Sequence, residues 1–186
     1  MTDREKFLVT LRGAANASGC PFPDYQAAEA ALESNFGESQ LFKIANNPFG
    51  AKQRKAPVYE TISLPTNEYI NGQWIRVPAD WIKYPDLASA MKHRMYMLQV
   101  LSKIYPDYKK ALASTIGENF VINVSRTWAT DPNRADKVLA IYNKYRYLFD
   151  APITTELTKI IPDPPANTSA PAQTYFQYLK KRFYKG

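Results

Sequence analysis

The chain has 186 residues, one cysteine, one histidine and a formal net charge of +7. That length suits a single domain with a sizeable core, the lone Cys20 excludes an internal disulfide, and Cys20 with His93 leaves no cluster with the spacing of zinc ligands. The hydrophobic content of 45% is that of a folded protein, and no apolar run approaches the ~18 residues of a membrane span. The positive charge favours an anionic partner such as nucleic acid, anionic lipid or a bacterial cell wall.

The N-terminal part of the sequence predicts two helices and a short helical turn. The first helix spans residues 3–16 and begins at Thr2 or the residue after it. The second is rich in alanine, the best helix former, and runs from a predicted cap at Asp24 to about Asn35. A break follows, and the short turn covers residues 39–44.

The middle of the sequence predicts a β-hairpin. Residues 58–84 are rich in β-branched and aromatic side chains, which favour strands. Asn71-Gly72 separates two such runs, and both central residues of a type I′ turn need positive φ. The Asn-Gly pair therefore predicts a tight antiparallel hairpin.

Helical periodicity returns after the hairpin. Apolar residues between Leu87 and Leu101 recur at helical spacing, behind a start at Asp86. Residues 117–128 predict another helix, and the segment 130–133 predicts the start of a last one that reaches about Tyr147. Helices, a small β insertion and more helices together predict an α+β fold.

The composition divides the chain into three parts. Residues 1–150 form the predicted domain, 151–173 an extended proline-rich linker, and 174–186 a short basic C-terminal segment. Four prolines lie in 162–171, which makes that stretch semi-rigid.

The chemically informative motif lies in residues 30–52, where a carboxylate follows an alanine-rich helix and precedes a serine, a glycine and an Asn-Asn-x-Phe-Gly-x-Lys run. It resembles the glucosaminidase signature of glycoside hydrolase family 73 (FlgJ-like), A-L-E-S-G-W-G-x-S followed by N-N-L-F-G-I-K. The segment from Thr66 to Gly72 is similar to the family's T-x-E-Y-x-N-G, and that from Trp128 to Lys137 is similar to its Y-A-T-D-P-N-Y-A-x-K. The matching positions in the first motif are Ala31, Leu32, Glu33, Ser34, Gly37, Ser39, Asn46, Asn47, Phe49, Gly50 and Lys52.

The chain differs from these patterns at a few positions. Glu29 stands where the family usually has glutamine, and Asn35-Phe36 replaces its Gly-Trp. Trp128 and Arg134 replace the two tyrosines that bracket Ala-Thr-Asp-Pro.

The resemblance implies a lysozyme-like helical domain with a small β-hairpin lobe, and an endo-β-N-acetylglucosaminidase that cleaves the GlcNAc–MurNAc backbone of peptidoglycan. It implies no metal and no organic cofactor, and we expect a monomer. The stretch before Gly19 lacks the features of a secretory signal. Because peptidoglycan is the implied substrate, we expect action at the bacterial cell envelope. The export route is not identified by this chain.

Glycosidic cleavage needs a carboxyl group that protonates the leaving oxygen, and the motif assigns this role to Glu33. Desolvation and repulsion from Glu29, four residues earlier, are the expected means of keeping it protonated. The resemblance assigns the second carboxylate, which activates water or stabilises the cationic transition state, to Glu68. Glu60 and Asp80 are the fallback candidates, and the acetamido oxygen of the substrate is an alternative to any of them.

Candidate substrate-binding residues also have structural interpretations. Asn47 and Phe49 are expected to shape the floor of a cleft, although their motif by itself also fits a turn. Tryptophan rings stack on flat sugar faces, but core packing explains a tryptophan equally well. The predicted substrate-binding residues are Asn47, Phe49, Trp74, Trp128, Asp131 and Arg134, with Trp81 as a further stacking candidate.

Two other function classes compete with this interpretation. The first is a non-catalytic glycan-binding or scaffold protein on the same fold, which the changes at Trp128 and Arg134 favour. The second, a nucleic-acid module, requires clustered basic residues with interleaved aromatics, and only residues 178–186 approach that pattern, so we expect no nucleic-acid partner. A Ser34–His93 hydrolase dyad lacks the strand-turn-helix context of such sites.

Overall fold

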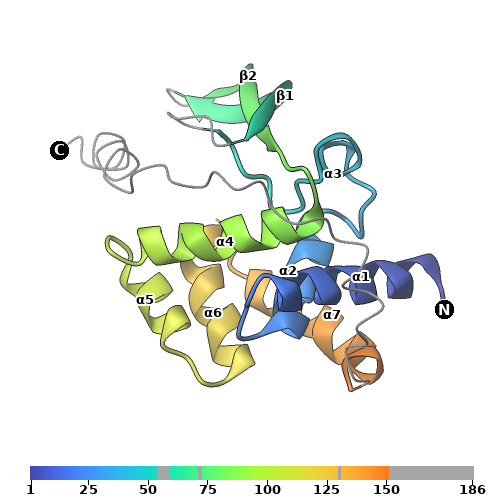
Figure 1. Ribbon diagram of the computed structural model, residues 1–186. Coiled ribbons are helices and arrows are strands. Elements are labelled where there is room, and N and C mark those ends of the chain that lie inside the picture. Colours follow the sequence, from blue (N-terminus) through green and yellow to red (C-terminus); the bar gives the residue numbers. More distant parts are fainter. Residues whose placement is uncertain (54–58, 71–72, 130, 151–186) are drawn as a thin grey trace.

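The computed structural model describes residues 1–53, 59–70, 73–129 and 131–150, and it consists of a helical body with a β-hairpin that stands away from it (Figure 1). The predicted Asn71-Gly72 turn, the linker and the basic segment lie outside the described residues. The helices are α1 (Asp3–Ala17), α2 (Pro23–Glu33), α3 (Gln40–Ala45), α4 (Leu87–Leu101), α5 (Pro106–Leu112), α6 (Gly117–Trp128) and α7 (Arg134–Phe149), and the strands are β1 (Glu60–Ile70) and β2 (Gln73–Lys83).

Helix α2 lies at the centre of the body. Its alanines Ala27, Ala28, Ala30 and Ala31 are fully buried, and its neighbours include α1 and α7. Small side chains let these helices approach closely on several sides. The α+β fold is confirmed, with every predicted helix and both strands present among the described residues.

The helix ends follow local chemistry, with two corrections. Helix α1 starts at Thr2, one of the two predicted positions, where Thr2 and Glu5 form a capping box. The N-cap of α2 is Phe22 rather than Asp24, which lies in the first turn and accepts a 2.6 Å hydrogen bond from Arg12 Nε. Helix α2 ends at Glu33 rather than near residue 35, because the next residues leave the helical conformation.

Helix α5 has no counterpart in the sequence prediction. It spans only seven residues and starts with a proline at its first position. So short a helix shows too few turns for a periodic apolar pattern to emerge. Its buried side chains Tyr108 and Ala111 pack into the main core, so the tertiary environment stabilises it.

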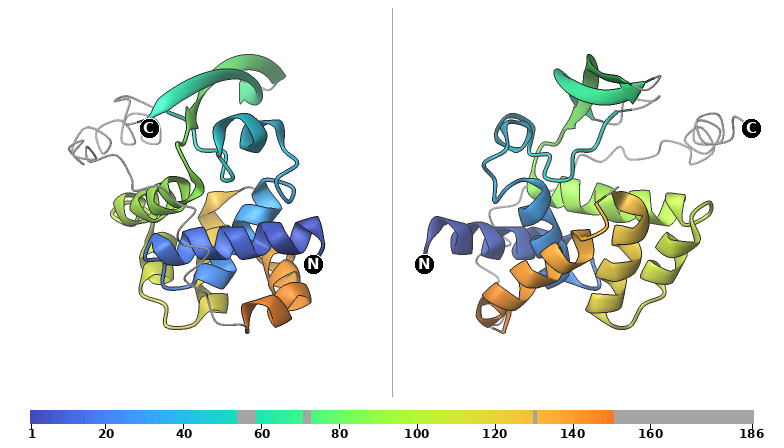
Figure 2. Two further views of the ribbon diagram at one scale, coloured as in Figure 1. Left: turned by 45° about the vertical axis from the view of Figure 1, so that its right-hand side comes forward. Right: turned by 180° about the vertical axis from the view of Figure 1, so that it is seen from behind.

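The hairpin lobe, β1 and β2, pairs in antiparallel register from Glu60 opposite Lys83 to Ile70 opposite Gln73. Pro65 lies directly opposite Pro78. Proline is tolerated here because both strands of a two-stranded sheet are edge strands. Figure 2 shows that the ribbon curves above the body and that none of the helices α1 to α7 covers its outer face.

A second, small apolar cluster of Ala51, Ile82, Tyr84 and Ala90 joins the lobe to the body. The Ile82 N–H donates to the Ala51 carbonyl at 3.0 Å, and the Tyr84 N–H donates to the Ala45 carbonyl at 2.8 Å. The Tyr84 hydroxyl is hydrogen-bonded to His93 Nδ1 on α4 at 2.6 Å. The base of the lobe is therefore fixed to the body by both backbone and side-chain contacts.

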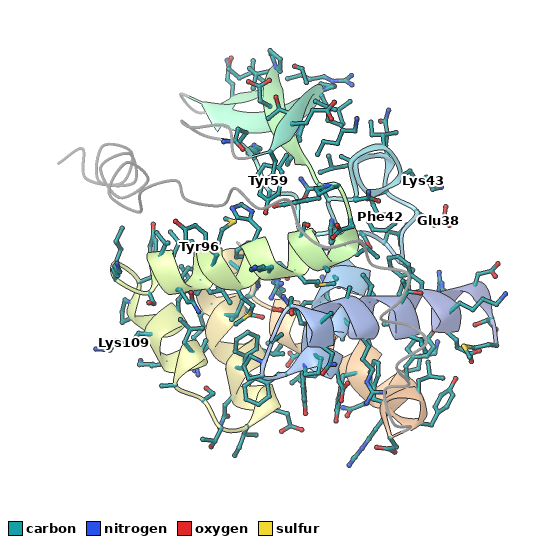
Figure 3. All side chains as sticks on the ribbon, in the orientation of Figure 1. Glu38, Phe42, Lys43, Tyr59, Tyr96 and Lys109 are labelled. Carbon is teal, nitrogen blue, oxygen red and sulfur yellow. The ribbon has the colours of Figure 1, made fainter. Side chains whose placement is uncertain are left out.

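Aromatic rings extend this joint along α4. The Tyr59 ring lies 5.5 Å from the His93 ring, and the Tyr96 ring stacks on the same histidine at 6.1 Å. Figure 3 shows Tyr59 between the lobe and α4, and Tyr96 farther along the same helix. None of the helices in the described ranges is both long and apolar enough to cross a bilayer.

Candidate active site

Glu33 is the last residue of α2, and a left-handed turn carries the chain away from it. Asn35, Phe36 and Gly37 have φ values of 50°, 53° and 83°. Ser34 stabilises this turn, because its hydroxyl donates to the Ala30 carbonyl at 2.6 Å and accepts from the Gly37 N–H at 3.1 Å. The turn exposes the Glu33 side chain at the end of an otherwise buried helix.

Glu33 is one end of a charge network that crosses the body. Arg134 Nε donates to Glu33 Oε1 at 2.8 Å, and Arg134 Nη1 donates to Glu29 Oε1 at 3.1 Å. The Ser125 hydroxyl accepts a second hydrogen bond from Nη1 at 2.8 Å. One guanidinium therefore joins α2, α6 and α7 at the predicted catalytic carboxylate.

A second arginine lies behind the first. Arg94 Nη2 approaches the Glu29 carboxylate at 3.4 Å. The Arg94 guanidinium also lies 3.6 Å from the centre of the Trp128 ring and 5.3 Å from that of Phe49. Contacts of this kind stabilise a buried cation through the ring quadrupole.

Burial differs sharply between the members of the network. The side chains of Glu29, Arg94 and Arg134 are 1%, 1% and 2% exposed, whereas that of Glu33 is 27% exposed. Glu33 is thus the group through which this network meets solvent.

The electrostatics of the two arginines follow from this burial. Burial by itself lowers the pKa of Arg134, but the carboxylates of Glu29 and Glu33 outweigh it, and the net shift is upward. Burial also lowers the pKa of Arg94, and the nearby Arg134 cation adds to this effect against the attraction of Glu29. The sequence suggested that Glu29 repels Glu33, whereas in the structure Arg134 lies between them and pairs with both.

The Asn-Asn-x-Phe-Gly motif builds a structural support. Asn47 Nδ2 donates to the Ala51 and Ile82 carbonyls at 2.8 and 2.9 Å, and its Oδ1 accepts from the Ala51 N–H at 2.9 Å. Asn47 is 1% and Phe49 is 5% exposed. Both residues lie beneath the surface, where they join the α3–β1 segment to β2 and to Arg94.

Trp128 and Asp131 line a cavity of about 950 Å³ beside the network. Tyr105 and Ser125 line it as well. Ser125 also accepts a hydrogen bond from Arg134, so this serine connects the cavity with the network. Asp131 also pairs with Lys137 at 2.6 Å. That hydrogen bond, with the Asn133 N–H, lowers the pKa of the exposed Asp131 carboxyl.

The hairpin carboxylates are not brought to Glu33 by any described contact. Glu68 lies on β1 opposite Ile75, and its side chain, like that of Trp74, is outside the described residues. The Glu60 side chain pairs with Lys83 across the strands at 3.0 Å. Asp80 is exposed on β2, while the Trp81 indole donates to the Leu64 carbonyl at 3.1 Å.

Two residues of the network, Arg94 and Ser125, were missed by the sequence analysis. A signal existed for Arg94, since it follows the buried Met91 by three positions and so falls on the core-facing side of α4. A charge on that side requires a buried partner. Ser34 and His93 form separate hydrogen bonds, to backbone groups and to Tyr84, and no trio of His, Cys, Asp or Glu in the described ranges is arranged to hold a metal.

Comparison with known proteins places the fold and motifs in one family. Residues 10–147 match the glucosaminidase family, described as mannosyl-glycoprotein endo-beta-N-acetylglucosaminidase. A probable N-acetylmuramidase of Lactococcus lactis is 28% identical over 153 residues, which cover 77% of this chain and 34% of that protein. The exo-glucosaminidase LytG of Bacillus subtilis is 32% identical over 125 residues, covering 66% of this chain and 44% of LytG.

A solved structure agrees with these sequence matches. The catalytic domain of the autolysin Auto from Listeria monocytogenes superposes with a TM-score of 0.70 at 25% identity, covering 80% of this chain and 88% of that domain. The chain spans between about a third and a half of the length of the curated relatives it matches. The family match covers most of the chain and includes the Glu33 motif and the Arg134 element, so this chain belongs to the glucosaminidase family of glycoside hydrolases.

Proposed function

We propose that this chain is a peptidoglycan hydrolase, an endo-β-N-acetylglucosaminidase that cleaves the GlcNAc–MurNAc backbone with Glu33 as its general acid. The observation that carries the proposal is the position of Glu33, a partly exposed carboxyl at the end of a buried helix within a family-matched motif. The named activities of the relatives, N-acetylmuramidase and glucosaminidase, support a peptidoglycan substrate.

The charge and the cavity support a glycan partner. A net charge of +7 attracts an anionic wall polymer. The cavity that Trp128 and Asp131 line offers an aromatic wall and a carboxylate near the network, which are groups that bind sugars through stacking and hydrogen bonds. We propose that the protein acts as a monomer at the bacterial cell envelope, with glycan strands as its partner.

The test is digestion of purified peptidoglycan followed by mass spectrometry of the fragments. Reducing-end N-acetylglucosamine identifies the proposed glucosaminidase, whereas reducing-end N-acetylmuramic acid identifies a muramidase. Glu33→Gln keeps the shape and removes the proton, so we expect digestion to fall on the order of 10²–10⁴-fold. Glu38→Gln is the matched control, because Glu38 is 67% exposed and pairs only with Lys43.

The second carboxylate is tested by a companion series. We propose Glu68 as the base or the stabiliser of the cationic transition state, and Glu68→Gln should slow digestion less than Glu33→Gln does, since the acetamido group of the substrate can partly substitute. Glu60→Gln and Asp80→Asn should have little effect. If Glu68→Gln digests peptidoglycan at the normal rate while Asp80→Asn or Glu60→Gln is strongly impaired, this assignment is contradicted. If all three variants digest at the normal rate, the role belongs to the acetamido group of the substrate.

A non-catalytic glycan-binding protein is the second candidate. The observation that favours it is the 2.8 Å contact between Arg134 and Glu33, because an ion-paired carboxylate has no proton to donate. Binding of wall fragments without any release of soluble saccharide, unchanged in Glu33→Gln, would support this candidate over the hydrolase.

A further inference from the structure

Arg134 is held as a rigid part of the structure rather than as a free surface cation. Its Nε and Nη1 groups contact acceptors on two helices, Glu33 and Glu29 on α2 and Ser125 on α6. The guanidinium is planar, so three contacts at two of its nitrogens fix its orientation. Because one of these contacts is to Glu33 Oε1, the same guanidinium fixes that carboxyl as well.

Two cations and two carboxylates meet at the Glu33 end of α2. Arg94 on α4 and Arg134 on α7 supply two cations, and Glu29 and Glu33 on α2 supply two carboxylates. Asp131, before α7, and Tyr108 on α5 also interact electrostatically with Arg134.

We propose that Arg134 is a positioning residue for Glu33, which holds the carboxyl in one orientation in the empty site. Its importance for catalysis rests on the proposed function. Proton donation then requires Glu33, which is 27% exposed, to take up a proton from solvent and its contact with Arg134 to lengthen when glycan occupies the site. Arg134 remains paired to Glu29 and Ser125 in that step, so it has partners when it releases Glu33.

Glu29 and Arg134 form a reciprocal pair in this proposal. They are the two positions at which the chain has charged residues in place of the glutamine and tyrosine of the glucosaminidase motifs, and they contact each other at 3.1 Å. A glutamine and a tyrosine can form a neutral hydrogen bond, whereas either one beside the opposite charged residue leaves a buried charge without its partner. The double variant Glu29→Gln/Arg134→Tyr should therefore lose less thermal stability than the two single variants added together.

The direct experiment follows the Glu33 carboxyl itself. In protein labelled with ¹³C at glutamate side chains, the Glu33 signal is assigned by its loss in Glu33→Gln, and its chemical shift is recorded against pH. Removing a cation this close to a carboxylate favours the protonated form, so Arg134→Gln should move the midpoint upward. Arg134→Lys keeps the charge and should leave the midpoint near that of the unchanged protein, as should Arg146→Gln, an exposed control on the same helix.

The orienting role has a kinetic readout. Lysine presents a compact charge that cannot hold two carboxylates and Ser125 in one plane. Arg134→Lys should therefore lower kcat for peptidoglycan digestion several-fold with KM unchanged. A raised KM with unchanged kcat would mean that Arg134 binds glycan directly, and this would overturn the proposal.

The two readouts separate this proposal from the proposed function. An unmoved or lowered midpoint in Arg134→Gln overturns the inference even if the protein digests peptidoglycan. An upward shift in a protein that does not digest peptidoglycan overturns the proposed function and leaves the positioning of Glu33 by Arg134 supported. If Arg134→Gln does not fold, Arg134→Lys carries the test alone, and an unchanged kcat in that variant overturns the inference.

Discussion

The Glu29→Gln substitution tests whether the buried charges stabilise the protein. Glutamine has nearly the same shape as glutamate but no charge, so the two guanidinium groups within 3.1 and 3.4 Å of Glu29 lose their shared buried counter-ion. The single carboxylate that remains to them, that of Glu33, is 27% exposed. The variant therefore leaves two like charges in the interior with one partly solvated partner.

The magnitude follows from burial. Removing one partner of a buried ion pair typically costs about 3–5 kcal/mol, and the 1–2% exposure of Glu29, Arg94 and Arg134 places this network in that class. A domain of this size loses about 2–4 °C in Tm per kcal/mol. We expect Glu29→Gln to melt roughly 6–20 °C below the unchanged protein.

Thermal unfolding followed by circular dichroism measures this difference, with Glu38→Gln as the control. Glu38 pairs with Lys43, but their side chains are 67% and 55% exposed, and Figure 3 shows both at the surface beside α3. Exposed pairs contribute about 0–1 kcal/mol, so the control should melt close to the unchanged protein. Equal Tm values for the two variants would refute the argument that the Glu29 network is buried and electrostatically coupled.

Three further expectations concern the joint, the turn and the tail. Burial lowers the pKa of His93 from 6.5 to about 4. The contribution of the neutral imidazole to folding stability is therefore fully present above pH 6.5 and is lost as pH falls toward 4. Tm should drop across that range, and it should drop less in His93→Gln. Asn35→Gly should leave Tm nearly unchanged while Asn35→Ala costs about 1 kcal/mol, because alanine is disfavoured at positive φ; equal melting of both would contradict the left-handed turn. Ending the chain at Pro162 should preserve folding and activity but weaken wall retention at low salt, since the removed segment carries one acid and four bases; loss of solubility would place the tail in the core.

Local chemistry determined most of the secondary structure. Three helices begin at a residue whose side chain accepts a hydrogen bond from the N–H three positions later. These residues are Thr2 for α1, Ser39 for α3 and Asp86 for α4. The hairpin followed from Asn71-Gly72 and its flanking strand formers, and its register is consistent with a two-residue connection. Such signals are visible in a single sequence because their physical causes are short-range.

Where local signals were weak or competing, tertiary packing decided. Asp24 is a good capping residue, but the helix starts earlier and Asp24 pairs with Arg12 of α1 instead. Helix α5 is too short for its pattern to be recognised and is stabilised by contacts of Tyr108 with the core. Packing energy summed over several helices exceeds the fraction of a kcal/mol that separates neighbouring helix starts.

The motif around Glu33 could be recognised in the sequence, and its environment could not. The resemblance singled out Glu33 as the candidate acid, and the family match covers that motif. Its ion-pair partner, Arg134, lies 101 positions away, and the buried Glu29 that holds Arg134 is 65 positions from Arg94. Long-range ion pairs have no local period, because only the packing of α2, α4, α6 and α7 brings their ends within hydrogen-bonding distance. The sequence by itself therefore determined which carboxyl stands at the site, and only the tertiary structure decided which charges surround it.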